Sequence, residues 1–114
     1  MSFLIDQRRP GGVTVLYLNG RIVLGEETTH LVETLKDLAA RGEKWILLNL
    51  GEVTYVDSGG LGALVRSHEA VTRQKGQLKL LRVPAQVQTL LRITKLHDLF
   101  EMFDDEASAV QSFT

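Results

Sequence analysis

The sequence predicts an α/β domain with a mixed sheet of four to five strands and about four helices. Short apolar runs rich in branched residues, typical of buried strands, alternate with longer segments in which apolar residues recur every three or four positions, as on one helix face. In chain order the elements are strand, strand, helix, strand, helix, strand, helix, strand, helix. This alternation implies that the later strands are parallel and joined by right-handed helical crossovers.

Length and composition are those of a globular domain, and we expect residues 1–114 to form a single one. Of the 114 residues, 44% are hydrophobic and 24% are charged. A chain of this size buries about two thirds of the surface that it exposes when unfolded. The sequence begins without a basic or long apolar segment and has no run of about 20 apolar residues, so we predict a cytoplasmic protein without membrane insertion.

The first part of the chain predicts a hairpin followed by a helix. A short edge strand over residues 3–8 and a second strand over residues 13–20 flank Pro10-Gly11-Gly12, which is a strong turn signal. A helix is expected from about Glu26, because acids suit a first turn, and it ends at Gly42, which suits a C-cap. Its apolar stripe consists of Leu31, Val32, Leu35, Leu38 and Ala39.

The second part predicts two strand and helix pairs, then a last short strand and a terminal helix. A buried strand over residues 45–50 leads to a helix that runs from Ser58 to near Gly76. Pro84 suits the first residue of the next helix, and the acids at 104–106 suit the start of the last one. The remaining strands are expected over residues 77–83 and 96–103.

The sheet edge at which the parallel strands end is the expected place for a binding site, because ligands of such sheets lie beyond the carboxyl ends of the strands. Two loops, over residues 20–25 and 56–60, leave strands and enter helices there. We therefore expect these two loops to lie side by side.

Asp57 and Ser58 stand where the central strand gives way to a helix. Either residue could accept a hydrogen bond from an unpaired N–H group of the first turn, and this capping role is the simplest interpretation. It leaves Gly59 and Gly60 unexplained, since each glycine costs about 1 kcal/mol against alanine inside a helix. The pattern indicates a need for bare backbone beside the hydroxyl group. The inward face of the helix is expected to hold Leu61, Leu64, Val65 and His68, and the outward face Arg66, Glu69 and Arg73.

Missing residue patterns argue against several kinds of binding site. Thirteen basic and fourteen acidic residues give a net charge of -1, which provides no electrostatic footprint for direct nucleic-acid binding. The chain has no cysteine, and His30, His68 and His97 lack the spacing of metal ligands, so we predict no metal site. Because glycine-rich phosphate loops are also missing, we predict no cofactor.

The sequence offers little support for catalysis. The letters D-S-G-G around Ser58 also surround the nucleophile of trypsin-like proteases, but those enzymes are built from two β-barrels and are much longer. Val56 stands where the hydrolase motif G-x-S-x-G requires its first glycine. No base is expected near Ser58 to activate it, so we predict no catalytic residue and no enzyme.

The sequence resembles the STAS domains and, within them, the bacterial anti-sigma factor antagonists, over nearly its whole length. The block V-T-Y-V-D-S-G-G-L-G-A-L at residues 53–64 is the most specific part. The other matching segments are L-N-G-R-I at residues 18–22, I-L-L-N-L at 46–50, L-K-L-L-R-V with Pro84 at 78–84, and L-L-R-I-T-K-L-H-D-L-F at 90–100.

The resemblance implies a STAS-like fold and a function in partner switching. In the family, the hydroxyl residue after the aspartate is phosphorylated by a serine kinase that is itself an anti-sigma factor, and Ser58 occupies that place. The unphosphorylated form binds the anti-sigma factor and frees a sigma factor, and a serine phosphatase reverses the modification. The resemblance further implies a monomer when free, with partner-binding residues Gly20, Arg21, Ile22, Val23, Asp57, Gly59, Gly60 and Leu61.

Three positions depart from the family pattern. Val23 replaces an acidic residue that many relatives carry, Gly59 replaces a second serine or threonine, and Lys95 replaces a glycine. The departures at Val23 and Gly59 lie in the loops expected to meet the kinase. An alternative function is therefore a constitutive STAS scaffold subunit of a signalling or lipid-transport assembly, in which Ser58 is only a helix cap.

Overall fold

The computed structural model describes residues 3–114 and contains one mixed five-stranded sheet in the order β1-β2-β3-β4-β5. β1 is antiparallel to β2, and each later strand is parallel to its neighbour. The predicted mixed α/β architecture is thus confirmed. The strands are β1 (Leu4–Arg8), β2 (Thr14–Ile22), β3 (Trp45–Val56), β4 (Gln77–Leu81) and β5 (Met102–Phe103), with a short 3-10 turn at Pro10–Gly12 between the first two.

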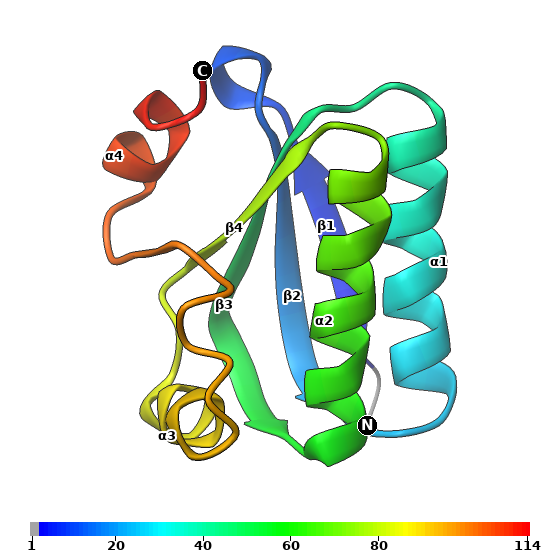
Figure 1. The fold of residues 1–114 in the computed structure, drawn as a ribbon, viewed down its shortest axis with the longest axis vertical. Coiled ribbons are helices and arrows are strands. Elements are labelled where there is room, and N and C mark those ends of the chain that lie inside the picture. The colour runs from blue at the N-terminus through cyan, green and yellow to red at the C-terminus, as the bar shows by residue number, and fades with distance from the viewer. Residues whose placement is uncertain (1–2) are drawn as a thin grey trace.

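Residues 3–114 also form four helices, which flank the sheet (Figure 1). They are α1 (Glu26–Ala40), α2 (Ser58–Arg73), α3 (Ala85–Ile93) and α4 (Glu106–Gln111). Figure 1 shows α1 and α2 side by side on one face, with α4 on the opposite side of the sheet and α3 near the end at which β3 gives way to α2. Because α1 and α2 each follow a strand, both begin at the carboxyl edge of the parallel strands.

Two apolar clusters, one on each face of the sheet, make up the core. The larger cluster joins alternate strand residues to the inward faces of α1 and α2, as at Leu16, Leu48 and Leu64. The smaller one joins the other strand face to the C-terminal segment and contains Val13, Val15, Leu47, Leu81, Ala109 and Phe113. The sheet is therefore apolar on both faces over part of its length, as expected for parallel strands with helices on both sides.

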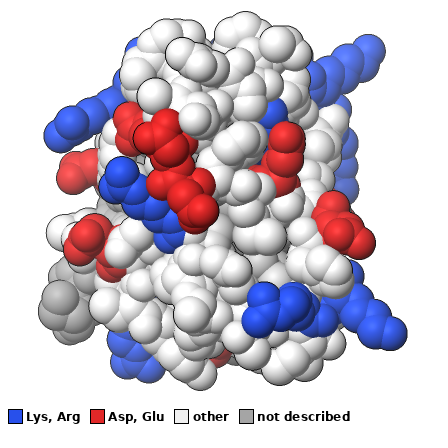
Figure 2. All heavy atoms as spheres, turned by 90° about the vertical axis from the view of Figure 1, so that its left-hand side faces the viewer, with Lys and Arg blue, Asp and Glu red and all other residues white. Residues whose placement is uncertain are grey.

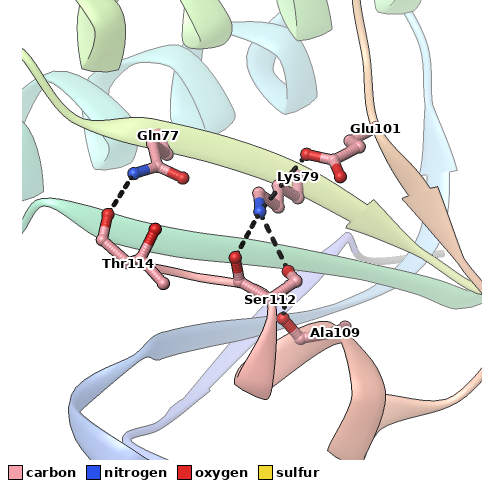
Figure 3. A network of polar contacts seen from close by, with 6 residues as sticks. All are labelled: Gln77, Lys79, Glu101, Ala109, Ser112 and Thr114. Atoms are coloured by element: carbon pink, nitrogen blue, oxygen red, sulfur yellow. Dashed lines mark hydrogen bonds and ion pairs between the residues drawn. The ribbon is translucent and has the colours of Figure 1, made fainter.

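The C-terminal segment is anchored by a buried lysine on β4 (Figure 3). The Lys79 side chain is 7% exposed, and its Nζ donates to the carbonyl and hydroxyl oxygens of Ser112 at 3.1 and 2.9 Å and pairs with Glu101 at 3.2 Å. The Phe113 ring centroid lies 4.5 Å from the same nitrogen. A second link joins Gln77 Nε2 to the carbonyl oxygen of Thr114. These contacts compensate a charge whose burial alone would be costly.

A tyrosine on β2 adds a further link to α4. The Tyr17 hydroxyl group donates to Glu106 Oε1 at 2.8 Å. Burial and this neighbouring carboxylate both raise the pKa of Tyr17 above its ordinary value. The hydroxyl group therefore keeps its proton and can act as the donor in this bond.

The predicted outward and inward faces of α2 are confirmed. Leu61 and Leu64 are buried, Val65 and His68 are half-buried, and the side chains expected in solvent are exposed. The half-buried His68 ring packs edge-on against Phe100 with the centroids 5.3 Å apart, and burial lowers its pKa.

Several predicted boundaries were wrong, and one predicted strand forms only in part. β2 runs on to Ile22 and β3 to Val56, because residues 21 and 22 pair with 55 and 56 beyond two bulges. Pro84 is the N-cap of α3 and not its first residue. The strand expected over 96–103 has only its last two residues, since the chain before it turns, with Leu96 N bonded to Leu91 O and Leu99 N to Leu96 O. α2 ends at Arg73 and β4 at Leu81, somewhat earlier than expected.

Candidate functional site

The two loops at the carboxyl edge of the sheet lie side by side, as predicted. The backbone N–H of Asp57 donates to the carbonyl oxygen of Ile22 at 3.3 Å, which carries the β2–β3 pairing one residue past the strands. Asp57 Oδ2 accepts a hydrogen bond from the backbone N–H of Leu24 at 3.2 Å. Because β2 extends to Ile22, the first loop is reduced to residues 23–25.

The cap of α2 is Asp57. Its Oδ1 accepts from the N–H of Gly60 at 2.6 Å, and its backbone is extended, as an N-cap requires. One carboxylate thus holds the start of α2 with one oxygen and the β2–α1 loop with the other. The alternative role of Ser58 as a helix cap is wrong, since that position belongs to Asp57.

Ser58 is the first residue of α2, and its side chain is exposed. Its hydroxyl group makes no hydrogen bond to the part of the chain that the structure describes. It stands beside the N–H groups of the first helical turn, where the positive end of the helix dipole favours an anion. The position can therefore accept a negatively charged group without displacing an existing contact.

The two glycines after Ser58 are required by packing within the chain. A β-carbon at Gly60 would overlap the carbonyl oxygen of Ile22, and one at Gly59 would lie 2.6 Å from Leu24 Cβ. The β2–α1 loop therefore crosses directly over the first turn of α2. The predicted need for bare backbone beside the hydroxyl group is met within the chain itself, because Ile22 and Leu24 occupy the space that the two β-carbons would take.

The predicted partner-binding residues lie together at this edge but differ in exposure. Arg21 is exposed, and Val23, Asp57 and Gly59 are partly exposed. The buried members are Gly20, Ile22, Gly60 and Leu61. The side chains of Ile22 and Leu61 belong to the larger apolar cluster and therefore face the core of this chain. The buried residues therefore support the exposed ones and do not themselves form the surface.

Sequence reasoning missed two exposed apolar side chains at the same edge. Leu24 is 74% exposed while it also packs on Gly59, and Tyr55 is 43% exposed. The Arg21 guanidinium group lies 5.7 Å from the centre of the Tyr55 ring, within the range of a cation–π contact. The signal for Tyr55 was its place one residue before the buried Val56, which puts it on the opposite face of the strand.

Other parts of the molecule offer less chemistry. A groove of about 430 Å³ between α2 and the segment before β5 is lined by His68, Lys79, His97 and Phe100 among others, and Ser58 is not part of its lining.

Within residues 3–114, no group of three acidic, histidine or cysteine side chains could hold a metal ion. In the same range, no helix is both long and apolar enough to cross a membrane. On the side shown in Figure 2, the acidic side chains lie next to basic ones and most of the surface is uncharged.

Removing the carboxylate of Asp57 should weaken both structure and site. We expect Asp57→Ala to lower the free energy of unfolding by about 0.5 to 2 kcal/mol, because the N–H groups of Gly60 and Leu24 lose their acceptor. Asp105→Ala is the matched control, since Asp105 caps α4 through the Ser108 N–H. Urea titration measures the stability, and the amide NMR signal of Leu24 should move only in the Asp57 variant. An unmoved Leu24 signal would contradict the bridging role.

Comparison with known proteins adds four likenesses. The family model described as STAS domain matches residues 5–109. A protein of Paenibacillus polymyxa called anti-sigma F factor antagonist is 25% identical over 112 residues, which cover 96% of this chain and 94% of that protein. An anti-sigma factor antagonist from Mycobacterium paratuberculosis has a similar solved structure, with a TM-score of 0.81 and 18% identity over 98% of this chain and 94% of that one.

The fold also matches SpoIIAA, described as a Bacillus cell fate determinant and solved in a phosphorylated form. The TM-score is 0.74 and the identity 16%, over 96% of this chain and 97% of that one. Both structural likenesses concern the fold.

Proposed function

Since this chain belongs to the STAS domain family, we propose that it acts as an anti-sigma factor antagonist switched by phosphorylation of Ser58. The observation that carries the proposal is the exposed Ser58 hydroxyl group at the first residue of α2, left free because Asp57 provides the cap. In this proposal an anti-sigma factor with serine kinase activity binds the unphosphorylated form, and a sigma factor is released. A serine phosphatase restores the binding form.

The fold should tolerate a phosphate at Ser58. The group would carry about -1.5 to -2 charges beside N–H groups of the first turn of a 16-residue helix, and helix starts bind such anions readily. No buried contact has to break, because the side chain is exposed. The phosphorylated structure of SpoIIAA, a protein of the same fold, supports the idea that such a fold accepts the modification.

The partner surface is proposed to combine Ser58 with the exposed side chains around it. Leu24 and Val23 supply apolar area on the β2–α1 loop, and Arg21 and Tyr55 supply a stacked pair at the strand ends. A phosphate there would stand next to the Asp57 carboxylate. Burying these two like charges against a kinase that already presents nucleotide phosphates is unfavourable, so the phosphorylated form would be released.

The switch requires three results together, measured with purified anti-sigma factor kinase from the organism that supplies this chain. The kinase should place phosphate on Ser58. Ser58→Ala should bind the kinase but stay unmodified. Phosphoserine at position 58 should weaken binding by more than about tenfold, because like charges meet in the interface, while the urea midpoint changes little.

A charge placed elsewhere on the same helix provides the control. Thr72 is exposed near the far end of α2, so Thr72→Asp adds one negative charge without entering the proposed surface. It should bind the kinase as tightly as the unmodified protein. If phosphoserine at position 58 also left the affinity unchanged, the switch would be contradicted and a constitutive STAS scaffold would be the better proposal.

A further inference from the structure

The backbone just before Asp57 has an unusual neighbour. β3 is longer than β4, and its pairing with β4 ends at Asn49 and Leu81. The last part of β3 therefore has β2 on one side only. At Val56 the open side is occupied by a side chain from α3.

Gln86 takes the place of a paired strand at Val56. Its Oε1 accepts a hydrogen bond from the Val56 N–H at 3.1 Å, and its Nε2 donates to the Val56 carbonyl oxygen at 2.9 Å. A primary amide offers both an acceptor and donors, so one side chain can satisfy both backbone groups as an adjacent strand would. We call this pair of hydrogen bonds the Gln86 clamp.

Val56 is held firmly on its other sides as well. Its side chain is fully buried in the larger apolar cluster, and its backbone pairs with Ile22 of β2. The Gln86 clamp adds the remaining constraint. The burial of Val56, its pairing with Ile22 and the Gln86 clamp together set the direction in which the chain leaves β3. They therefore also set the positions of Asp57 and Ser58.

We infer that Gln86 is a positioning residue for Ser58. The clamp fixes the peptide groups on either side of Val56, Asp57 follows directly, and Ser58 begins α2 from that fixed point. α3 is itself held in place by the buried Val87 and Leu91. The position of the Ser58 hydroxyl group is thereby tied to α3, a helix that does not contain it. The consequence for phosphorylation depends on the proposed function, whereas the positioning does not.

A second glutamine on α3 provides a matched control. Gln88 Nε2 donates to the Val83 carbonyl oxygen at 3.0 Å, so its side chain also bonds to backbone, but at the entry to α3 and not at β3. Gln86→Met and Gln88→Met each remove one amide and keep a side chain of similar length. Only the first removes the Gln86 clamp.

The first test needs no partner. Amide hydrogen exchange followed by NMR should show the Val56 N–H exchanging at least about tenfold faster in Gln86→Met, because its acceptor is gone. The amide signals of Ser58 and Gly60 should move in the same variant. In Gln88→Met the Val56 exchange rate and those signals should match the unmodified protein. Gln86→Glu, which keeps an acceptor but loses the donor, should shift the Ser58 signal with a smaller change in Val56 exchange.

Either of two results would overturn the inference: Val56 exchange that is the same in Gln86→Met as in the unmodified protein, or Ser58 and Gly60 signals that stay in place. Both measurements are made on the protein without a kinase, so they do not depend on whether the proposed switch is correct. With the purified anti-sigma factor kinase, Gln86→Met should lower kcat for Ser58 phosphorylation several-fold with KM nearly unchanged, and Gln88→Met should alter neither. Equal kcat values for the two variants would overturn the link between the clamp and phosphorylation.

Discussion

Gly60→Ala is expected to lower the free energy of unfolding by about 3 kcal/mol, although alanine is the better helix former. Gly60 lies in the first turn of α2, directly against β2. An added β-carbon would overlap the carbonyl oxygen of Ile22 and lie 2.9 Å from Val56 Cγ1. Both obstacles belong to paired strands, so relief requires a shift of the helix start, and that shift would also disturb the Asp57 cap.

Gly62→Ala is the control, because Gly62 stands two residues further along the same helix. A β-carbon there would meet only the end of the flexible Arg66 side chain, at 3.3 Å. This variant should raise the stability by about 0.5 to 1 kcal/mol through helix propensity alone. Urea titration should thus give changes of opposite sign for the two glycines. A loss at both positions would contradict the assignment of Gly60 to close packing.

Leu64→Ala should destabilise the fold by about 2 to 5 kcal/mol. Leu64 is completely buried between α2 and the sheet, so truncation removes apolar contacts and leaves a cavity that the surrounding strands cannot close. Arg66→Ala, two residues away on the exposed face, should change the stability by less than about 0.5 kcal/mol. Similar losses for the two variants in a denaturant titration would show that the inward face of α2 is assigned incorrectly.

The sequence was sufficient to predict the order of the elements and the end of the sheet at which the two loops meet. The spacing of apolar residues differs between strands and helices and therefore identified both kinds of element. The loops around Ile22 and Asp57 were expected side by side because both follow parallel strands. The segment before β5 was mistaken for a strand because Leu96 and Phe100 are apolar. Both residues in fact pack against the core from turns, and apolar content alone does not distinguish these two cases.

The finer features of the site depend on contacts between distant residues. Asp57 and Ser58 are both good caps, and only the backbone geometry assigns the role to Asp57. Gly60 is needed because the carbonyl group of Ile22 on β2 lies against it, and the residues around Gly60 in the sequence do not indicate this contact. Gln86 is a polar residue in the first turn of a helix, and nothing in its immediate sequence links it to Val56, thirty positions earlier.

The sequence separation between these contacting residues also affects when the surface around Ser58 forms during folding. The hydrogen bond between Leu24 and Asp57 spans 33 residues and the Gln86 clamp spans 30, and pairing of β2 with β3 closes the loop that contains α1. Contacts of this kind form late, because the entropy of closing the intervening loop opposes them. A chain that is still folding, or that has lost the β2–β3 pairing, carries Ser58 but lacks the surface around it. Under the proposed function, a kinase that binds this surface would therefore phosphorylate the native protein and not its unfolded copies.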